Sequence, residues 1–342
     1  MGWGSSLLNL LSNDLAIDLG TANTLVHVKG RGLVLDEPSM VAISERDGQV
    51  LAVGSAAKEM YGKTPGHIKT IRPMKDGVIA DFDVTKLMIS YFIRQILRRR
   101  PLIHPRMVIC IPSGITQVEK RAVIDSADQS GARKVFLIEE PMAAAIGSNL
   151  PINGPKGNMV VDIGGGTTEV AVIASSAIAT SESIRVAGDE MDEAIMHFMR
   201  HQYHLQVGPF EAERVKIEIG TTFPQKEKLE CQIRGRDIIE GIPKIMTITD
   251  DMIRESLDIP VVAIVDSIRR TLDKTTPELA SDIYDRGVVL AGGGSLLRGL
   301  PERLNKEIGL KFFLAEDPLR AIVRGSGIVL ENFKLWSKVC VS

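Results

Sequence analysis

Two short turns that share one pattern constrain the fold of this chain more than any other feature. The first turn reads Asp18-Leu-Gly-Thr-Ala-Asn-Thr24 and the second reads Asp162-Ile-Gly-Gly-Gly-Thr-Thr168. An Asp, an aliphatic residue, a Gly and a final Thr therefore coincide. Each turn lies between two apolar runs, which is the pattern of a strand, a turn and a second strand. Two such hairpins predict a chain that is built from two related halves.

The glycines of the second turn indicate a phosphate site. A backbone without Cβ atoms lets consecutive N–H groups converge on phosphate oxygens, and threonine hydroxyls add further donors. Asp18 and Asp162 each stand at the end of the strand before a turn, where a carboxylate repels phosphate unless a divalent cation lies between them. One such turn alone is equally well an ordinary glycine-rich hairpin, but the second matching turn favours phosphate binding.

A third glycine turn, Ala291-Gly-Gly-Gly-Ser295, follows an apolar strand and precedes a helical pattern. A strand end that leads into a helix is a place where the phosphate or the base of a nucleotide binds. Taken alone, this turn is as well explained by an ordinary loop. The sequence contains neither a P-loop nor the glycine fingerprint of dinucleotide-binding folds, so the predicted phosphate site belongs to another fold.

Strand and helix patterns alternate along the rest of the chain, which predicts an α/β fold with sheets covered on both faces. Expected helices cover residues 85–100, 116–130, 140–149, 189–204, 250–273, 295–308 and 318–336. Expected strands outside the hairpins cover residues 107–111, 134–138 and 287–290. Gly154-Pro155-Lys156-Gly157 favours a turn and marks the expected boundary between the halves.

Composition excludes several classes of protein. Hydrophobic residues make up 44% and charged residues 25% of the 342 residues, which excludes wholesale disorder. The net charge of −2 argues against a general nucleic-acid binder. Cys110, Cys231 and Cys340 are too few and too scattered for a disulfide framework or a zinc site, and they fit a reducing compartment.

Three histidines recur at helical spacing within the expected helix 189–204. His197, His201 and His204 have a spacing that metal ligands use. Apolar residues surround them, and no nearby cysteine completes a site. They are therefore interpreted as a partly exposed structural face of the helix.

Several segments resemble the motifs of the actin-like ATPases, and in particular those of the MreB family of bacterial actins. The segments with the superfamily motifs are Asp18–Thr24, Ile138–Gly147, Asp162–Val170 and Ala291–Leu297. Residues 71–81 and 277–282 are similar to the MreB family specifically. The resemblance implies an α/β, actin-like two-lobed ATPase fold, with two related RNase H-like halves and a nucleotide cleft between them.

The resemblance also implies how the chain is divided. Lobe I is expected to span residues 15–154, with an insertion subdomain at about residues 41–74, and to be completed by residues 324–342. Lobe II is expected to span residues 155–323, with an insertion subdomain at about residues 191–254. Residues 1–14 are expected to form an amphipathic N-terminal membrane segment.

Site roles follow from the resemblance residue by residue, with ATP and Mg²⁺ as the ligands. The expected phosphate-binding residues are Gly20, Thr21, Ala22 and Asn23 from one lobe and Gly164, Gly165, Gly166 and Thr167 from the other. The residues expected at the nucleoside are Glu213, Arg214, Val215 and Lys216 on one side and Gly292, Gly293, Gly294 and Ser295 on the other. Asp18 and Asp162 are expected to orient Mg²⁺ and its waters.

Glu140 is the residue expected to support hydrolysis. It lies between a predicted strand and a predicted helix, where a carboxylate can orient the water that attacks the γ-phosphate. Thr167 can help to place that water. The alternative is that a carboxylate at a helix start compensates the helix dipole. Glu139 and Glu140 can divide these roles, and the family pattern favours Glu140 as the catalytic residue.

The first residues of the chain predict a helix that lies in a membrane interface. On a helical projection the apolar residues gather on one side and the polar residues on the other, and tryptophan suits the headgroup boundary. The alternative is a helix docked on its own lobe. A second apolar element lies on a loop that touches the bilayer in MreB relatives. The expected membrane residues are Trp3, Leu7, Leu8, Leu10, Leu11, Leu102 and Ile103.

The function implied by the resemblance is an ATP-dependent polymerising bacterial actin whose membrane-associated filaments organise cell-wall synthesis and maintain rod shape. Expected partners are further copies of the chain, the inner face of the cytoplasmic membrane, and RodZ, MreC and MreD of the elongation complex, with no nucleic acid. The expected location is cytoplasmic and membrane-associated. Two alternatives are a chaperone-type ATPase, which needs a peptide-binding domain, and a sugar or acetate kinase, which needs a substrate base and a carbohydrate pocket.

Overall fold

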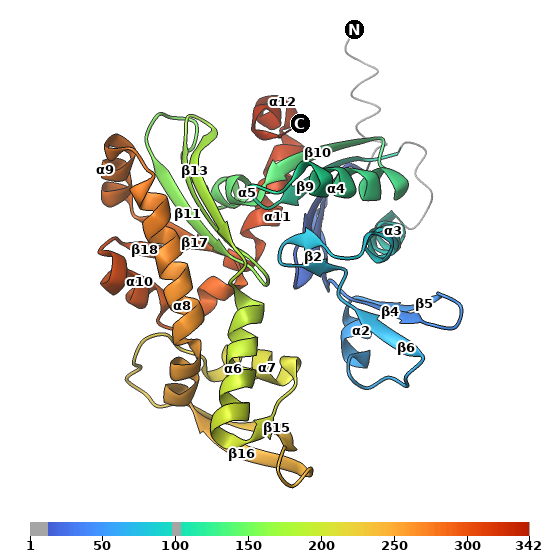
Figure 1. Cartoon of the computed structure of the whole chain (residues 1–342). Coiled ribbons are helices and arrows are strands. Elements are labelled where there is room, and N and C mark those ends of the chain that lie inside the picture. The colour runs from blue at the N-terminus through green and yellow to red at the C-terminus, as the bar shows by residue number, and fades with distance from the viewer. Residues whose placement is uncertain (1–12, 98–103, 342) are drawn as a thin grey trace. The chain divides into compact units, whose positions relative to one another are not determined.

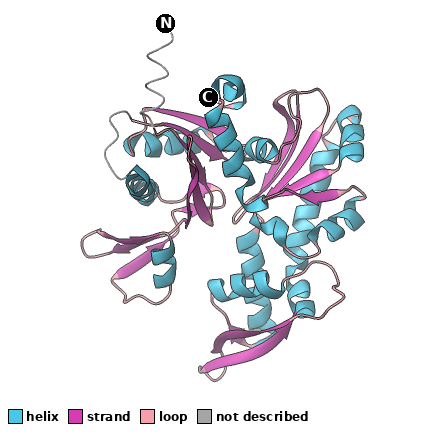
Figure 2. Cartoon of the chain, turned by 180° about the vertical axis from the view of Figure 1, so that it is seen from behind, coloured by secondary structure: helices cyan, strands magenta, loops and turns pink. Residues whose placement is uncertain are grey.

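The computed structural model describes residues 13–97 and 104–341, and the chain divides into two compact units. Unit 1 comprises Met1–Pro155, Ser175–Ile178 and Arg320–Ser342, and unit 2 comprises Lys156–Ala174 and Ala179–Leu319. Strands and helices both contribute to each unit (Figure 2). The predicted α/β class is therefore confirmed.

Unit 1 is built around a five-stranded sheet with the strand order β10-β9-β1-β2-β3. Its strands are β1 (Leu15–Leu19), β2 (Asn23–Val28), β3 (Gly32–Pro38), β9 (Arg106–Ile111) and β10 (Lys134–Glu139). β1 pairs antiparallel with β2 and parallel with β9, and β9 pairs parallel with β10. The carboxyl ends of β1, β9 and β10 consequently lie at the same edge of the sheet.

The core of unit 1 forms where alternating apolar residues of these strands meet α3 (Phe82–Leu97) and α4 (Gln117–Gln129). Ile17 and Ile109, paired across β1 and β9, are at most 2% exposed. Asp14 is fully buried just before β1, and its carboxylate accepts hydrogen bonds from the backbone N–H of Arg106 at 2.9 Å and from its Nε at 2.8 Å. This buried ion pair holds the start of β1 against the start of β9.

The other face of this sheet carries α5 (Glu140–Gly147) and α11 (Ala321–Glu331), which lie side by side (Figure 1). Glycines allow the two helices to approach closely. A Cβ on Gly147 would lie 1.9 Å from the carbonyl oxygen of Ala321, and a Cβ on Gly325 would lie 1.8 Å from that of Ala143. The backbone N–H of Val341 also donates to the carbonyl of Leu137 in β10 at 2.9 Å. Residues 13–155 and residues 320–341, which are far apart in the sequence, therefore pack together in unit 1.

The remaining elements of unit 1 are short. A three-stranded sheet has the order β5-β4-β6, and β7 pairs with β8. These elements are β4 (Val41–Ser44), β5 (Val50–Val53), α2 (Ser55–Met60), β6 (Ile68–Ile71), β7 (Met74–Lys75), β8 (Val78–Ile79), α12 (Phe333–Trp336) and η3 (Ser337–Val339).

Unit 2 contains a five-stranded sheet with the order β13-β12-β11-β17-β18. Its strands are β11 (Asn158–Ile163), β12 (Thr168–Ala174), β13 (Ala177–Ile184), β17 (Val288–Ala291) and β18 (Phe312–Leu314). β11 pairs antiparallel with β12 and parallel with β17, which pairs parallel with β18. This arrangement repeats β3-β2-β1-β9-β10 strand by strand, so the prediction of two related halves is confirmed.

Helices and a second, three-stranded sheet complete unit 2. Its other elements are α6 (Gly188–Tyr203), β14 (Leu205–Gln206), α7 (Pro209–Ile219), β15 (Glu230–Asp237), β16 (Pro243–Thr249), α8 (Asp250–Asp273), α9 (Pro277–Arg286), η1 (Gly293–Leu296) and α10 (Leu300–Ile308). Apolar residues of α6, α7 and α8 pack with β11, β12 and β17 in one core. Across the described residues of both units, no helix combines the length and apolar character that crossing a bilayer requires.

Two predicted helices are wrong in extent. The expected helix 295–308 is interrupted after η1 because Gly299 adopts a left-handed φ of 71°, and α10 begins only at Leu300. The expected helix 318–336 consists of η2 (Pro318–Arg320), α11 and α12, with a break at Asn332, where φ is −113° and ψ is 44°. His204 likewise lies outside α6, with a left-handed φ of 52°.

Candidate functional site

The first predicted phosphate turn connects β1 to β2. A Cβ on Gly20 would lie 2.7 Å from the carbonyl oxygen of Asn23, so the turn requires glycine there. The hydroxyl of Thr21 accepts a hydrogen bond from the backbone N–H of Gly77 at 3.0 Å. Ser39 holds the other side of the turn. Its hydroxyl donates to the carbonyl of Gly20 at 2.7 Å, and its backbone N–H donates to the carbonyl of Ala22. Two distant segments of unit 1 therefore fix the shape of this turn.

The carboxyl edge of the unit 1 sheet carries both Asp18 and Glu140. Asp18 is near the end of β1, and Glu140 is the first residue of α5, directly after β10. Each is 7% exposed. Since β9 lies between β1 and β10 and neighbouring strands are about 4.8 Å apart, the two strands stand about 10 Å apart. The two residues therefore follow strands that are two places apart at one edge of the sheet.

The carboxylate of Asp18 lies in surroundings that suit a cation. Burial, with a smaller contribution from the nearby negative charge of Asp36, raises the pKa of Asp18 to about 7. A divalent cation offsets both effects, and carboxylate oxygens are ligands that Mg²⁺ prefers. The residues present at this turn therefore fit a magnesium ion.

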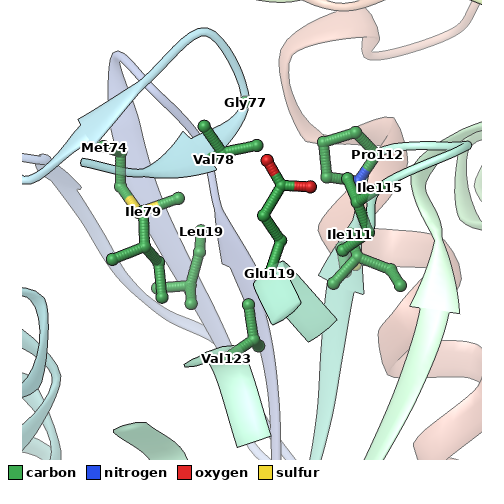
Figure 3. A pocket seen from close by; sticks show the side chains of 11 residues that line it. Leu19, Met74, Gly77, Val78, Ile79, Ile111, Pro112, Ile115, Glu119 and Val123 are labelled. Carbon is green, nitrogen blue, oxygen red and sulfur yellow. The ribbon is translucent and has the colours of Figure 1, made fainter. Parts of the chain in front are cut away.

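A small apolar pocket adjoins the same turn (Figure 3). It is lined by Leu19 of β1, by Gly77, and by Ile111 and Val123 among others. Glu119 is the charged residue among those that line it, and its carboxylate accepts a hydrogen bond from the backbone N–H of Thr116 at 2.7 Å. That bond belongs to the capping box that begins α4. One side of the first turn is consequently apolar.

The second predicted phosphate turn connects β11 to β12 and is closed by a hydrogen bond of 2.9 Å from the N–H of Gly164 to the carbonyl of Thr167. The start of α6 holds it from outside. The N–H groups of Gly188 and Asp189 donate to the carbonyls of Gly164 and Gly165 at 3.2 and 2.7 Å. Gly164, Gly165 and Gly166 do not adopt a left-handed φ, so no unusual backbone conformation requires glycine at these positions.

The third glycine turn lies against the end of β11, because β17 runs parallel to β11 with Asp162 opposite Ala291. Gly292 adopts a φ of 78°, and a Cβ there would lie 2.2 Å from the carbonyl oxygen of Ile163. A Cβ on Gly294 would lie 2.4 Å from Cγ2 of Ile163. Ser295 is fully buried, and its hydroxyl donates to the carbonyl of Gly292 at 2.7 Å. The second and third turns are therefore neighbours in unit 2, and Gly293 lies between the two constrained glycines.

Lys216 brings a positive charge next to the second turn. Its Nζ lies 2.8 Å from Oδ1 of Asp192 and donates to the carbonyl of Gly188 at 2.7 Å. A Cβ on Gly188 would lie within 4 Å of three groups, which are the carbonyl of Gly164, the Cα of Gly165 and the Nζ of Lys216. Burial raises the pKa of Asp192 to about 6, against the opposing effect of Lys216.

The four residues predicted at the adenosine do not share one environment. Val215 is fully buried in the unit 2 core. The guanidinium of Arg214 forms ion pairs with Glu211 and Glu218 on its own helix. Glu213 and Lys216 lie three residues apart and therefore share a face of α7, and both act electrostatically on Asp192.

Three residues that support the turns were not predicted from the sequence. The sequence pattern places Asp192 only in a helix, it shows no strand before Ser39, and it places Gly77 only in a segment that resembles the family. The contacts that they make join segments far apart in the chain, and one sequence carries no signal for such contacts.

The histidines of α6 and the predicted membrane residues do not belong to the turns described above. Among residues 13–97 and 104–341, no group of three or more His, Cys, Asp or Glu side chains is arranged to hold a metal ion, and His197 and His201 stack on α6 with ring centroids 6.3 Å apart. The predicted membrane residues Trp3, Leu7, Leu8, Leu10, Leu11, Leu102 and Ile103 lie outside the described residues.

Comparisons with known proteins give the family. The family model described as MreB/Mbl protein matches residues 12–338. The cell shape-determining protein MreB of Escherichia coli (strain K12) is 53% identical over 329 residues, which cover 94% of this chain and 94% of that protein.

Solved structures match over nearly the whole chain. The crystal structure of MreB5 of Spiroplasma citri bound to ADP has a TM-score of 0.90 and 35% sequence identity, covering 95% of this chain and 98% of that chain. The structure of the same protein bound to AMPPNP has a TM-score of 0.89 and 35% identity, covering 95% and 97%. These matches confirm the predicted actin-like fold, and the chain belongs to the MreB/Mbl family.

Proposed function

We propose that this chain is an ATP-dependent polymerising bacterial actin that determines cell shape. The observation that carries the proposal is the repetition of one arrangement in both units, a buried Asp at the end of a strand followed by a glycine-containing turn that leads into an antiparallel strand. Asp18 and Asp162 occupy equivalent positions in the two repeated sheets. The name of the Escherichia coli relative, and the ADP and AMPPNP bound by the Spiroplasma citri relative, support this reading.

The two turns bind the phosphates of one nucleotide in this proposal. The backbone N–H groups of residues 20–23 and 164–167 donate to phosphate oxygens, and Asp18 and Asp162 hold Mg²⁺ through its waters. Bound Mg²⁺ supplies positive charge that neutralises the phosphates. Glu213 and Lys216 face the nucleoside from α7, and Gly292–Ser295 covers its other side.

Glu140 and Thr167 support hydrolysis in the proposal. Glu140 has a fixed position because it begins a fully buried helix. Its carboxylate can accept a hydrogen bond from the attacking water and orient it toward the γ-phosphate. The hydroxyl of Thr167, 7% exposed at the end of the second turn, adds a second group for that water.

The filaments are proposed to lie on the inner face of the cytoplasmic membrane and to work with RodZ, MreC and MreD in cell-wall synthesis. The apolar residues among positions 3–11 and 102–103 are the proposed membrane contacts. Each copy contributes a weak contact, and a filament that presents many copies on one face binds firmly through avidity.

Sedimentation tests the proposal against the two alternative ATPase classes. The full chain is expected to pellet with ATP and Mg²⁺ and to stay in the supernatant with EDTA. Single-turnover assays with radiolabelled ATP are expected to release inorganic phosphate and to transfer none to glycerol, glucose or acetate. Transfer to an acceptor without sedimentation would favour a kinase, and stimulation by unfolded peptide without sedimentation would favour a chaperone.

A further inference from the structure

A groove follows the surface of unit 2 between α6 and α8, which lie side by side (Figure 1). Its volume is 540 Å³, and its lining residues lie between Val186 and Gln202 on one side and between Glu255 and Ala263 on the other. The nucleotide site proposed above uses none of these residues. The groove is thus a separate feature of the surface.

The walls of this groove are largely apolar. Ala194 and Phe198 of α6 line it together with Pro260 and Ala263 of α8. Ile259, which also lines the groove, is 83% exposed. An isoleucine so exposed beside a half-buried phenylalanine offers apolar area that a partner can remove from water.

Apart from His197 and His201, the ionisable residues that line the groove are all acidic. Glu190, Glu193 and Glu255 line it, and no Lys or Arg does. Glu190 uses one carboxylate oxygen to accept a hydrogen bond from the backbone N–H of Ala187 at 3.0 Å. Within the described part of the chain, Glu193 and Glu255 form no ion pair. The groove therefore favours a cationic occupant and disfavours phosphates, nucleic acid and anionic lipid.

The backbone of α8 adds a further acceptor. Pro260 lies inside the helix and has no N–H, so the carbonyl of Ser256 lacks the donor that a residue four positions later normally supplies. Both residues line the groove. A carbonyl without its usual intrahelical partner can accept a hydrogen bond from a cationic side chain.

We propose that the α6–α8 groove binds an amphipathic helix of a protein partner, with Lys or Arg flanking its apolar face. Two helices that pack side by side leave a groove that a third helix can fill. The lining residues of α6, from Glu190 to Gln202, extend over about 18 Å at 1.5 Å per residue, which matches somewhat more than three turns of helix. The exposed Ile259 meets the apolar face of that helix, and the three glutamates meet its cations.

The test uses the full chain and a labelled, end-capped 18-residue peptide of leucine and lysine, designed as an amphipathic helix, with binding measured by fluorescence anisotropy. Glu193→Lys with Glu255→Lys is expected to weaken binding about tenfold, because two attractions become repulsions. Glu227→Lys with Glu302→Lys is the matched control, since it changes two exposed glutamates outside the groove by the same charge. This control is expected to stay within twofold of the unmodified chain.

Two isoleucine variants test whether the apolar surface of the groove contacts the peptide. Ile259→Ser is expected to weaken peptide binding about fivefold, whereas Ile217→Ser, at a position 67% exposed on α7, is expected to have no effect. Both positions are on the surface, so melting temperatures are expected to stay unchanged and to show that each variant folds.

Two outcomes would overturn the proposal. Equal weakening by the two glutamate pairs would show attraction to overall charge rather than to the groove. The Glu193→Lys, Glu255→Lys variant could instead bind the peptide normally and lose ATP-dependent sedimentation. That result would make this surface a contact between copies of the chain. Neither outcome depends on the nucleotide-site assignments.

Discussion

Replacing Gly292 with Ala tests whether the third turn needs its close approach to β11. Two separate effects oppose an alanine at this position. The backbone has a φ of 78° and a ψ of 160°, a region that only glycine adopts readily. The new Cβ would also lie 2.2 Å from the carbonyl oxygen of Ile163, about 1 Å closer than van der Waals contact allows.

The two effects give the size of the expected change. A side chain in this backbone region costs about 1–3 kcal/mol, and forcing an extra carbon into a packed contact costs about 1–3 kcal/mol more. For a unit of this size each kcal/mol lowers the melting temperature by about 2–4 °C, so a fall of order 10 °C is expected. A turn displaced by about 1 Å is also expected to weaken ADP binding by at least tenfold.

Gly309→Ala is the matched control. Gly309 has a φ of 81° and a ψ of 11°, and a Cβ there would have no neighbour within 4 Å. Its alanine variant is expected to lose only about 1–2 kcal/mol of stability and no ADP affinity. Differential scanning fluorimetry and isothermal titration calorimetry measure both properties. A Gly292→Ala protein that melts no lower than Gly309→Ala and binds ADP normally would refute the close approach.

Three further predictions concern hydrolysis, pH and the membrane. Glu140→Gln is expected to retain AMPPNP affinity, because backbone groups hold the phosphates, and to lose about 10²–10⁴-fold in phosphate release; an unchanged rate in the presence of polymer would remove Glu140 from the mechanism. Burial raises the pKa of Asp192 to about 6, so the folded chain keeps a proton that the unfolded chain releases near pH 4. The contribution of this carboxyl group to stability therefore falls by about 2 kcal/mol as pH rises from 4 to 6, and the melting temperature of the unmodified chain relative to Asp192→Asn is expected to fall over the same range; a constant difference would contradict this. Deleting residues 1–12 is expected to stop filaments from floating with liposomes while ATP-dependent sedimentation continues, and flotation that persists undiminished would assign the contact to residues 102–103 or to partner proteins.

The two related halves of the fold could be predicted because each contains a recognisable pattern within a short stretch of sequence. An apolar run, an Asp, a glycine turn and a second apolar run define β1–β2 and β11–β12 without knowledge of any distant contact. The repeated strand order then follows from the same local pattern in two places. β13 was missed because its residues, Ala177–Ile184, alternate between half-buried and exposed and carry four Thr, Ser or Glu side chains, so no apolar run marks them.

Residues 213–216 show why a run of consecutive residues does not predict a shared site on a helix. Four consecutive residues were assigned to one site, but successive side chains on a helix point about 100° apart. Only Glu213 and Lys216 can face the same neighbour, while Val215 enters the core and Arg214 pairs with glutamates. The ion pair of Lys216 with Asp192 depends on how α6 packs on α7, which no local pattern specifies.

The close packing of α5 against α11 has a consequence for how the protein is made. Residues 320–342 complete the core of a unit whose other residues are mostly the first to leave the ribosome. At 5–20 residues per second, synthesis of the intervening residues takes about 10–30 s. During that interval Gly147 and its helix have no Gly325 to pack against, whereas unit 2, nearly continuous in sequence, can close its core. Unit 1 therefore completes its core only after unit 2 has been synthesised, and its sheet keeps an uncovered apolar face until residues 320–342 have been added.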